Sequence, residues 1–100
     1  MRTELANGTL TMYPEGHINS QNASEFEREA MAVVDGVRWA SVVVDAEKLV
    51  YISSAGLRVL MRIMRRAGNR LQVINVLPEV YDVFDVTGFT DLMDVRERGR

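Results

Sequence analysis

Cysteine is absent from this chain of 100 residues, and proline, tryptophan and histidine are scarce, with two, one and one residues. Without cysteine there is no disulfide framework, no thiol nucleophile and no thiolate ligand for a metal ion. The single histidine, His17, has no nearby pair of carboxylates at ligand spacing, which argues against a metal site. Nothing in the sequence indicates a cofactor.

An excess of charge of one sign is also missing. The 12 lysines and arginines nearly balance the 14 aspartates and glutamates, and the net charge is −2. There is therefore no global basic field to attract nucleic acid or a membrane surface. The longest apolar runs are a few residues, far short of the roughly 20 that cross a bilayer, and the N-terminus does not resemble a signal peptide. We expect a cytoplasmic protein that binds neither nucleic acid nor membrane.

Size and composition suit one globular unit. The chain is 47% apolar and 26% charged, and 100 residues are too few for two independent cores. The expected organisation is a single domain spanning residues 1–100.

The N-terminal third predicts a hairpin followed by a helix. Asn7-Gly8 joins two short alternating segments, Thr3–Ala6 and Thr9–Tyr13, and both turn residues tolerate positive φ. Asn22, with Glu25 three residues later, has the spacing of a capping box at a helix start. The expected helix has one apolar stripe and a terminal glycine: Phe26, Ala30, Val33, Val34 and Gly36.

The rest of the chain alternates strands with helices. Trp39–Val44 is rich in β-branched residues without alternation, which predicts a strand buried on both faces. The later expected elements are a helix that begins after Ser53-Ser54 and ends at Ala67-Gly68-Asn69, a strand over Leu71–Val76, a helix from Pro78 to Thr87-Gly88, and a strand over Leu92–Val95. The first of these helices has an apolar stripe that should face the core: Leu57, Leu60, Met61 and Met64. The order ββαβαβαβ predicts an α/β fold, in which helices pack on a mostly parallel sheet with an antiparallel N-terminal hairpin at its edge.

Ser54 draws attention because it lies at or beside the cap of the second helix. A hydroxyl there can accept a backbone N–H bond, and the helix dipole favours negative charge at this end. A phosphate on Ser54 would fit that field, and Gly56 is expected to leave the approach to the backbone open. Local chemistry alone leaves both interpretations standing, a plain helix cap and a phosphorylation site.

Four segments carry a resemblance to a known family. They are Gly16-His17-Ile18-Asn19, Val42-Val43-Val44-Asp45, Ile52-Ser53-Ser54-Ala55-Gly56-Leu57 and Val83-Phe84-Asp85-Val86-Thr87-Gly88-Phe89. In this order and spacing they resemble the STAS domain of bacterial anti-sigma factor antagonists, also called anti-anti-sigma factors. The third segment is similar to the family's phosphorylation motif, Met-Asp-Ser-(Ser/Thr)-Gly-Leu. Carried across, the phosphorylated serine falls on Ser54.

The resemblance implies a partner-switching protein that is not an enzyme. Its unphosphorylated form would bind an anti-sigma factor that is also a serine kinase, and so release a sigma factor. Phosphorylation by that ATP-dependent kinase would abolish binding, and a metal-dependent serine phosphatase would restore it. The residues expected at the partner interface are His17, Asn19, Ser53, Ala55, Gly56 and Arg58.

The chain departs from the family pattern at three of these positions. Ser53 and Asn19 stand where the family has acidic residues, and His17 stands where it has glutamate. Ser53 is therefore a second candidate for the phosphate. The lost carboxylates also favour an alternative, a constitutive interaction module on the same fold. A nucleotide-binding STAS domain is a third possibility, although no glycine-rich phosphate loop supports it.

Two further features have competing interpretations. The basic stripe Arg58, Arg62, Arg65 and Arg66 is either a solvated helix face or a surface for an acidic partner. It lacks the interleaved aromatic residues of a nucleic-acid site. A hydrolase nucleophile at Ser54 is disfavoured, because Ile52 occupies the place of the first glycine in a Gly-x-Ser-x-Gly elbow.

Overall fold

Seven strands and three α-helices make up residues 1–99, the part of the chain that the computed structural model describes. The strands are β1 (Arg2–Ala6), β2 (Thr9–Tyr13), β3 (Gly16–Ile18), β4 (Ser41–Asp45), β5 (Leu49–Ile52), β6 (Leu71–Val76) and β7 (Asp94–Glu97). The helices are α1 (Ala23–Gly36), α2 (Ser54–Arg66) and α3 (Pro78–Val86), followed by a short 3₁₀ helix at Phe89–Asp91.

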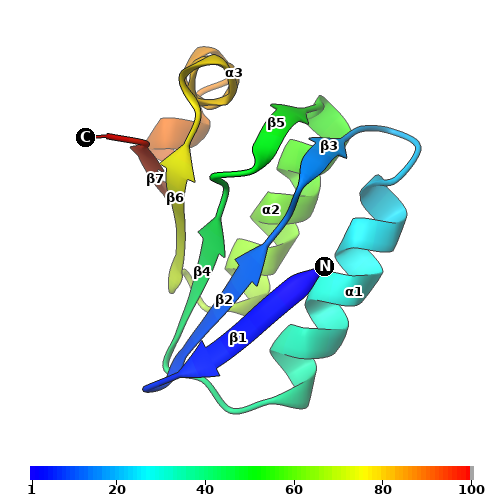
Figure 1. Cartoon of the computed structure of the whole chain (residues 1–100), viewed down its shortest axis with the longest axis vertical. Helices are drawn as coiled ribbons and strands as arrows, with labels where there is room; N and C mark the ends of the chain where they lie inside the picture. The colour runs from blue at the N-terminus through cyan, green and yellow to red at the C-terminus, as the bar shows by residue number, and fades with distance from the viewer. Residues whose placement is uncertain (100) are drawn as a thin grey trace.

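Five of the strands form one mixed sheet in the order β1-β2-β4-β6-β7 (Figure 1). The β1–β2 pair is antiparallel and the other three pairs are parallel. Asn7 and Gly8 form the hairpin turn with φ of 52° and 80°, as their residue types predict. The predicted α/β class, with its antiparallel edge, is confirmed.

Two short strands that the sequence did not reveal form a second, parallel sheet. β3 pairs with β5, and the register slips between Gly16 and His17. Along β5 the side chains run buried, exposed, exposed, buried. Strands of three and four residues with such a slip show no regular alternation, and so they could not be recognised from the sequence pattern. They extend the molecule beyond the carboxyl end of β2 (Figure 1).

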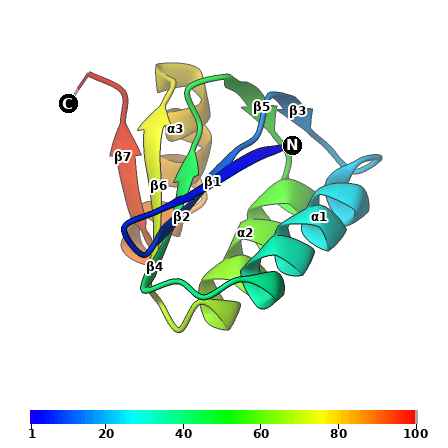
Figure 2. The same cartoon turned by 60° about the horizontal axis from the view of Figure 1, so that its bottom comes forward.

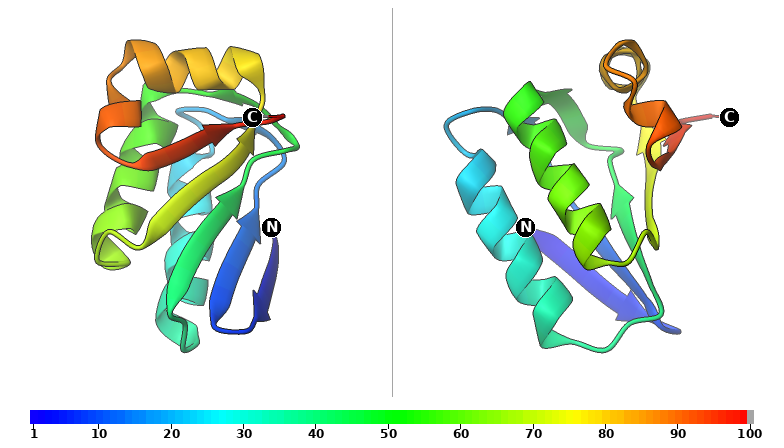
Figure 3. Two further views of the ribbon diagram at one scale, coloured as in Figure 1. Left: turned by 90° about the vertical axis from the view of Figure 1, so that its left-hand side faces the viewer. Right: turned by 180° about the vertical axis from the view of Figure 1, so that it is seen from behind.

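The helices lie on one side of the large sheet, and no helix within residues 1–99 covers the other side (Figures 2 and 3). α1 and α2 run side by side along the covered face, and α3 lies across the top, against β5 and β7. Val42 and Val44 are fully buried, whereas Val43, which points the other way, is only half-buried. The prediction that this strand is buried on both faces is therefore wrong. Because the run Val42-Val43-Val44 has no alternation of polar and apolar residues, the sequence does not reveal which face of the strand is packed by helices.

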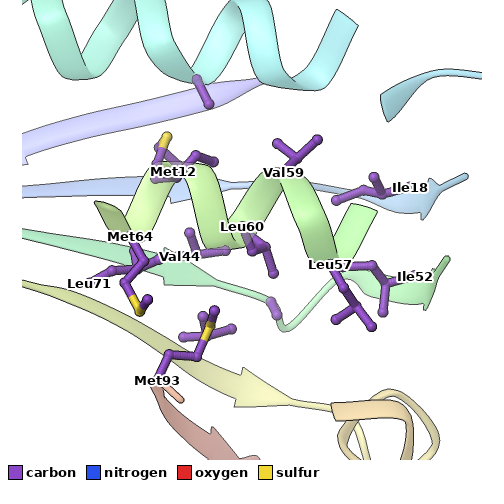
Figure 4. Packing of buried hydrophobic residues seen from close by; sticks show 14 of the residues in the cluster. Met12, Ile18, Val44, Ile52, Leu57, Val59, Leu60, Met64, Leu71 and Met93 are labelled. Carbon is purple, nitrogen blue, oxygen red and sulfur yellow. The ribbon is translucent and has the colours of Figure 1, made fainter. Parts of the chain in front are cut away.

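The core lies between the helices and the sheet. α2 contributes Leu57, Leu60 and Ile63, each at most 1% exposed. Leu60 lies beside Val44 of the large sheet, and Leu57 lies beside Ile52 of β5 (Figure 4). The predicted stripes of α1 and α2 are thus confirmed as the packing faces.

One expected boundary and one expected helix cap differ from the structure. Leu92–Val95 was expected as the last strand, but β7 runs over Asp94–Glu97 and Leu92 belongs to the turn after the 3₁₀ helix. Asn22 is the residue before α1, as predicted, but its side chain makes no cap hydrogen bond. The capping box is therefore not formed.

Candidate functional site

At the first turn of α2, the structure shows which of the two neighbouring serines, Ser53 or Ser54, caps the helix. Ser53 is the N-cap, with extended backbone, and its Oγ accepts a hydrogen bond from the backbone N of Gly56 at 3.2 Å. The backbone N of Leu57 donates to the Ser53 carbonyl oxygen at 2.9 Å. Ser54 is the first residue of the helix itself. The capping role therefore belongs to Ser53.

Ser54 presents its hydroxyl to solvent. The residue is exposed, and its side chain makes no hydrogen bond to any other part of residues 1–99. Ser53, by contrast, is half-buried and its oxygen is engaged in the cap. Of the two neighbouring hydroxyls, Ser54 is the one that an incoming enzyme or partner can reach without opening the helix end.

Gly56 lies inside the protein, and the expectation that it leaves the backbone open to approach is wrong. A Cβ at this position would stand 2.7 Å from Ile52 Cγ1 and 2.8 Å from Ile18 Cγ2. Real Cβ atoms do not come that close to carbon atoms. Gly56 therefore allows the first turn of α2 to pack tightly onto β3 and β5, and it offers no side chain to a partner.

The β3–β5 pair brings the early motif beside α2. Ile18 pairs with Ile52, and the backbone N of Ser53 donates to the Ile18 carbonyl oxygen at 2.8 Å. His17 and Asn19, which flank Ile18, thereby come to the same end of the molecule as the Ser53-Ser54 turn. The structure thus brings together residues that lie more than 30 positions apart in the sequence.

Asn19 organises the loop that leads into α1. Its Oδ1 accepts hydrogen bonds from the backbone N of Gln21 and of Asn22, at 2.9 and 3.1 Å. In return, Asn22 Oδ1 accepts from the Asn19 backbone N at 2.8 Å, and Asn22 Nδ2 donates to the His17 carbonyl oxygen at 2.8 Å. The Asn19 side chain is thus engaged within its own loop. An aspartate could accept the same two backbone bonds.

The sequence analysis did not single out Val50 and Tyr51, two neighbouring residues of β5. They are 50% and 46% exposed, which is high for large apolar side chains on a strand. The Tyr51 ring lies with its centroid 6.1 Å from that of the exposed His17, at an interplanar angle of 47°. The apolar run Leu49–Ile52 gave no signal of this exposure. We call His17, Tyr51, Ser54 and Arg58 the switch surface.

The arginines of α2 divide into paired and unpaired members. Arg62 forms a two-pronged ion pair with Glu27 of α1, at 2.6 and 2.9 Å, and Arg66 contacts Asp35 at 2.7 Å. The hydrogen bond from Arg62 holds the pKa of the Glu27 carboxyl below its usual value. Arg58 and Arg65 are exposed, and neither makes a side-chain bond within residues 1–99. The stripe thus partly joins α1 to α2.

No group of three or more histidine, cysteine, aspartate or glutamate side chains in residues 1–99 could hold a metal ion. In the same part of the chain, no helix is long and apolar enough to cross a bilayer. The other expected site residue, Ala55, is half-buried in the first turn of α2.

Comparisons with known proteins point in one direction. The family model of the STAS domain matches residues 1–98. BtrV of Bordetella bronchiseptica, a proposed anti-sigma factor antagonist, is 39% identical over 92 residues, which cover 88% of this chain and 78% of BtrV.

Two solved structures share the fold. An anti-sigma factor antagonist from Mycobacterium paratuberculosis superposes with a TM-score of 0.84 at 19% identity, covering 95% of this chain and 82% of the other. The Bacillus cell fate determinant SpoIIAA, solved in its phosphorylated form, superposes with a TM-score of 0.67 at 16% identity, covering 94% and 88%.

Proposed function

Because the chain belongs to the STAS domain family, and because its relatives include anti-sigma factor antagonists, we propose that it is a regulatory protein that works by partner switching. In its unphosphorylated form it binds an anti-sigma factor that is also a serine kinase, and the sigma factor is released. It acts in the cytoplasm, as one domain, and needs no catalytic group or cofactor of its own.

One observation carries the choice of Ser54 as the modified residue. Its hydroxyl is exposed and unbonded, while the adjacent Ser53 holds the helix cap. A kinase that transfers the γ-phosphoryl group of ATP to Ser54 Oγ, with loss of the hydroxyl proton and release of ADP, leaves the cap intact. The relative SpoIIAA has been solved in a phosphorylated form, which supports this type of regulation.

The physical effect of the modification is electrostatic. The phosphate brings about 1.5–2 negative charges and three acceptor oxygens to a surface that was neutral at that point. An interface formed around the hydroxyl would have to desolvate that dianion. A penalty of about 3–5 kcal/mol lowers affinity by hundreds to thousands of fold. A metal-dependent serine phosphatase reverses the change by hydrolysing the phosphate ester.

The partner meets the switch surface. Tyr51 supplies apolar contact area, and His17 and Arg58 supply polar and cationic edges. Asn19, Ser53 and Gly56 contribute indirectly, because they shape the loop, the cap and the packing beneath.

The absence of acidic residues at positions 19 and 53 favours the second candidate, a constitutive interaction module. The two functions share the switch surface and differ in whether Ser54 is ever modified.

Incubation with the cognate anti-sigma kinase and ATP tests the proposal. Intact-mass measurement and fragmentation should show one phosphate on Ser54, which is lost in Ser54→Ala and kept in the matched control Ser53→Ala. Phosphate on Ser53 in the wild-type chain would contradict the choice of residue. If neither serine is modified and Ser54→Asp binds the anti-sigma factor as tightly as wild type, the constitutive module is the correct function.

A further inference from the structure

Arg58 is a cation without a counter-charge in the first turns of α2. Its side chain is exposed and makes no hydrogen bond or ion pair within residues 1–99. In the same helix Arg62 and Arg66 are held by carboxylates of α1. Arg58 lies one turn too early to share in that pairing, and the residues beside it at this end, Ser53 and Asn19, are neutral.

The helix geometry places Arg58 over Ser54. Residues four apart on an α-helix have Cβ atoms roughly 5–6 Å apart on one face. The Cα–Cβ bonds of a helix tilt toward its N-terminus, so the side chain of Arg58 leans back toward the first turn. An anion at position i with a cation at i+4 is the more favourable of the two possible orders.

The backbone offers a phosphate at Ser54 only part of the usual helix-end amides. The backbone N of Gly56 already donates to Ser53 Oγ, and that of Leu57 donates to the Ser53 carbonyl oxygen. Only the amides of Ser54 and Ala55 remain in the first turn. The two remaining amides are too few to satisfy the three phosphate oxygens as hydrogen-bond acceptors, and a guanidinium can donate the missing bonds.

We propose that Arg58 is the intramolecular counter-ion of phosphorylated Ser54. The inference rests on the proposed phosphorylation of Ser54, and it adds a second effect to the switch. In the unmodified protein the guanidinium is available to a carboxylate of the anti-sigma factor. After phosphorylation it is drawn back to the phosphate, so the modification both adds an anion to the switch surface and withdraws a cation from it.

A phosphorus NMR titration of the full chain, with phosphoserine incorporated at position 54 during translation, tests the pairing without any kinase. A phosphoserine loses its second proton near pH 6. Since Arg58 favours the dianion, Arg58→Gln should raise this pKa by roughly 0.2–0.4 pH unit, while Arg58→Lys should recover part of the difference. The matched control is Arg65→Gln, which removes the other unpaired arginine of α2 and should leave the titration unchanged.

His17 also lies at this end of the molecule and could contact the phosphate, so the series is repeated in a His17→Gln background. The Arg58 effect should persist there and should shrink in high salt. The pairing would be overturned if the phosphate of Arg58→Gln had the same pKa as that of the parent protein and of the control Arg65→Gln. Because the phosphoserine is incorporated during translation and no kinase is used, that result would not contradict the proposed partner switching. Conversely, a kinase that fails to modify Ser54 would not contradict the pairing.

Discussion

At the scale of single residues, the start of α2 assigns different tasks to two adjacent serines. Ser53 holds the helix end through its hydroxyl oxygen, and Ser54 leaves its hydroxyl in solvent. The sequence motif predicted that one of them caps and that one is a modification site, but the assignment depends on where the helix begins. Helix boundaries shift by a residue or two, and pattern alone does not fix them.

Alanine at each serine should separate the two tasks in urea unfolding. Ser53→Ala should lower the free energy of unfolding by about 1 kcal/mol, the usual cost of a lost N-cap. Ser54→Ala should change it by less than about 0.5 kcal/mol, since an exposed helical position loses no contact. Equal losses in the two variants would show that the cap is shared between them.

Gly56 provides a second test at the residue scale. Gly56→Ala should destabilise the fold by about 1–3 kcal/mol, because the added methyl group meets Ile18 and Ile52 at less than 3 Å. The control is Gly36→Ala at the end of α1, where nothing lies within 4 Å of the new Cβ. There alanine should be neutral or slightly stabilising. Thermal unfolding of both variants gives the comparison, and a neutral Gly56→Ala would contradict the tight packing of α2 on β3 and β5.

At the scale of elements, two exposed ion pairs, Arg62–Glu27 and Arg66–Asp35, connect α2 to α1. The sequence predicted both helices and their buried stripes, because apolar residues that recur every 3.6 positions can be recognised within a single segment of the chain. It could not predict that Arg62 reaches Glu27, since the relative placement of two helices is set by the sheet beneath them. The same limit hid β3 and β5, which exist only as a pair.

Removing Arg62 should raise the pKa of Glu27 toward its ordinary value, because the hydrogen bond from Arg62 is the largest cause of its lowering. A carboxyl whose pKa is lowered in the folded state adds stability above its unfolded pKa, and loses it as the pH falls through the folded pKa. In Arg62→Ala, the free energy of unfolding should therefore no longer fall when acidification protonates Glu27. Carbon-detected NMR titration of the glutamate carboxyls reads the change directly.

The control for this titration is Arg66→Ala, which breaks the neighbouring pair with Asp35 and should leave the Glu27 titration where it is. If Glu27 titrates alike in Arg62→Ala and in wild type, the two-pronged contact does not persist in solution.

At the scale of the whole molecule, the helices of residues 1–99 cover one side of the large sheet and leave its other side without helical cover. The sequence predicted a mostly parallel sheet with an antiparallel N-terminal edge, because alternating strands and helices impose right-handed crossovers. It did not predict the uncovered face, because Val42-Val43-Val44 reads the same whether one face or both are packed. The sequence singled out His17, Ser54 and Arg58 at the candidate site. It revealed neither Tyr51 nor the geometry of the site, which the β3–β5 pair creates.

Neighbouring valines of β4 test the one-sided cover. Val44→Thr places a hydroxyl in the core and should lower the free energy of unfolding by about 1–3 kcal/mol. Val43→Thr faces the uncovered side and should cost less than about 0.5 kcal/mol, since threonine suits a half-exposed strand. Similar losses at both positions in chemical denaturation would mean that something covers the outer face.

Because Ser53 and Ser54 have different roles, the two positions should tolerate different substitutions during evolution. Position 53 must keep a side chain that caps, and serine, threonine, aspartate and asparagine all do so. A carboxylate beside Ser54 can therefore be gained or lost in a lineage with little change in stability. Position 54 is free of folding constraints, so selection reaches it only through the molecules that its hydroxyl meets. The affinity of the protein for its regulators can accordingly be retuned, substitution by substitution, while the scaffold stays the same.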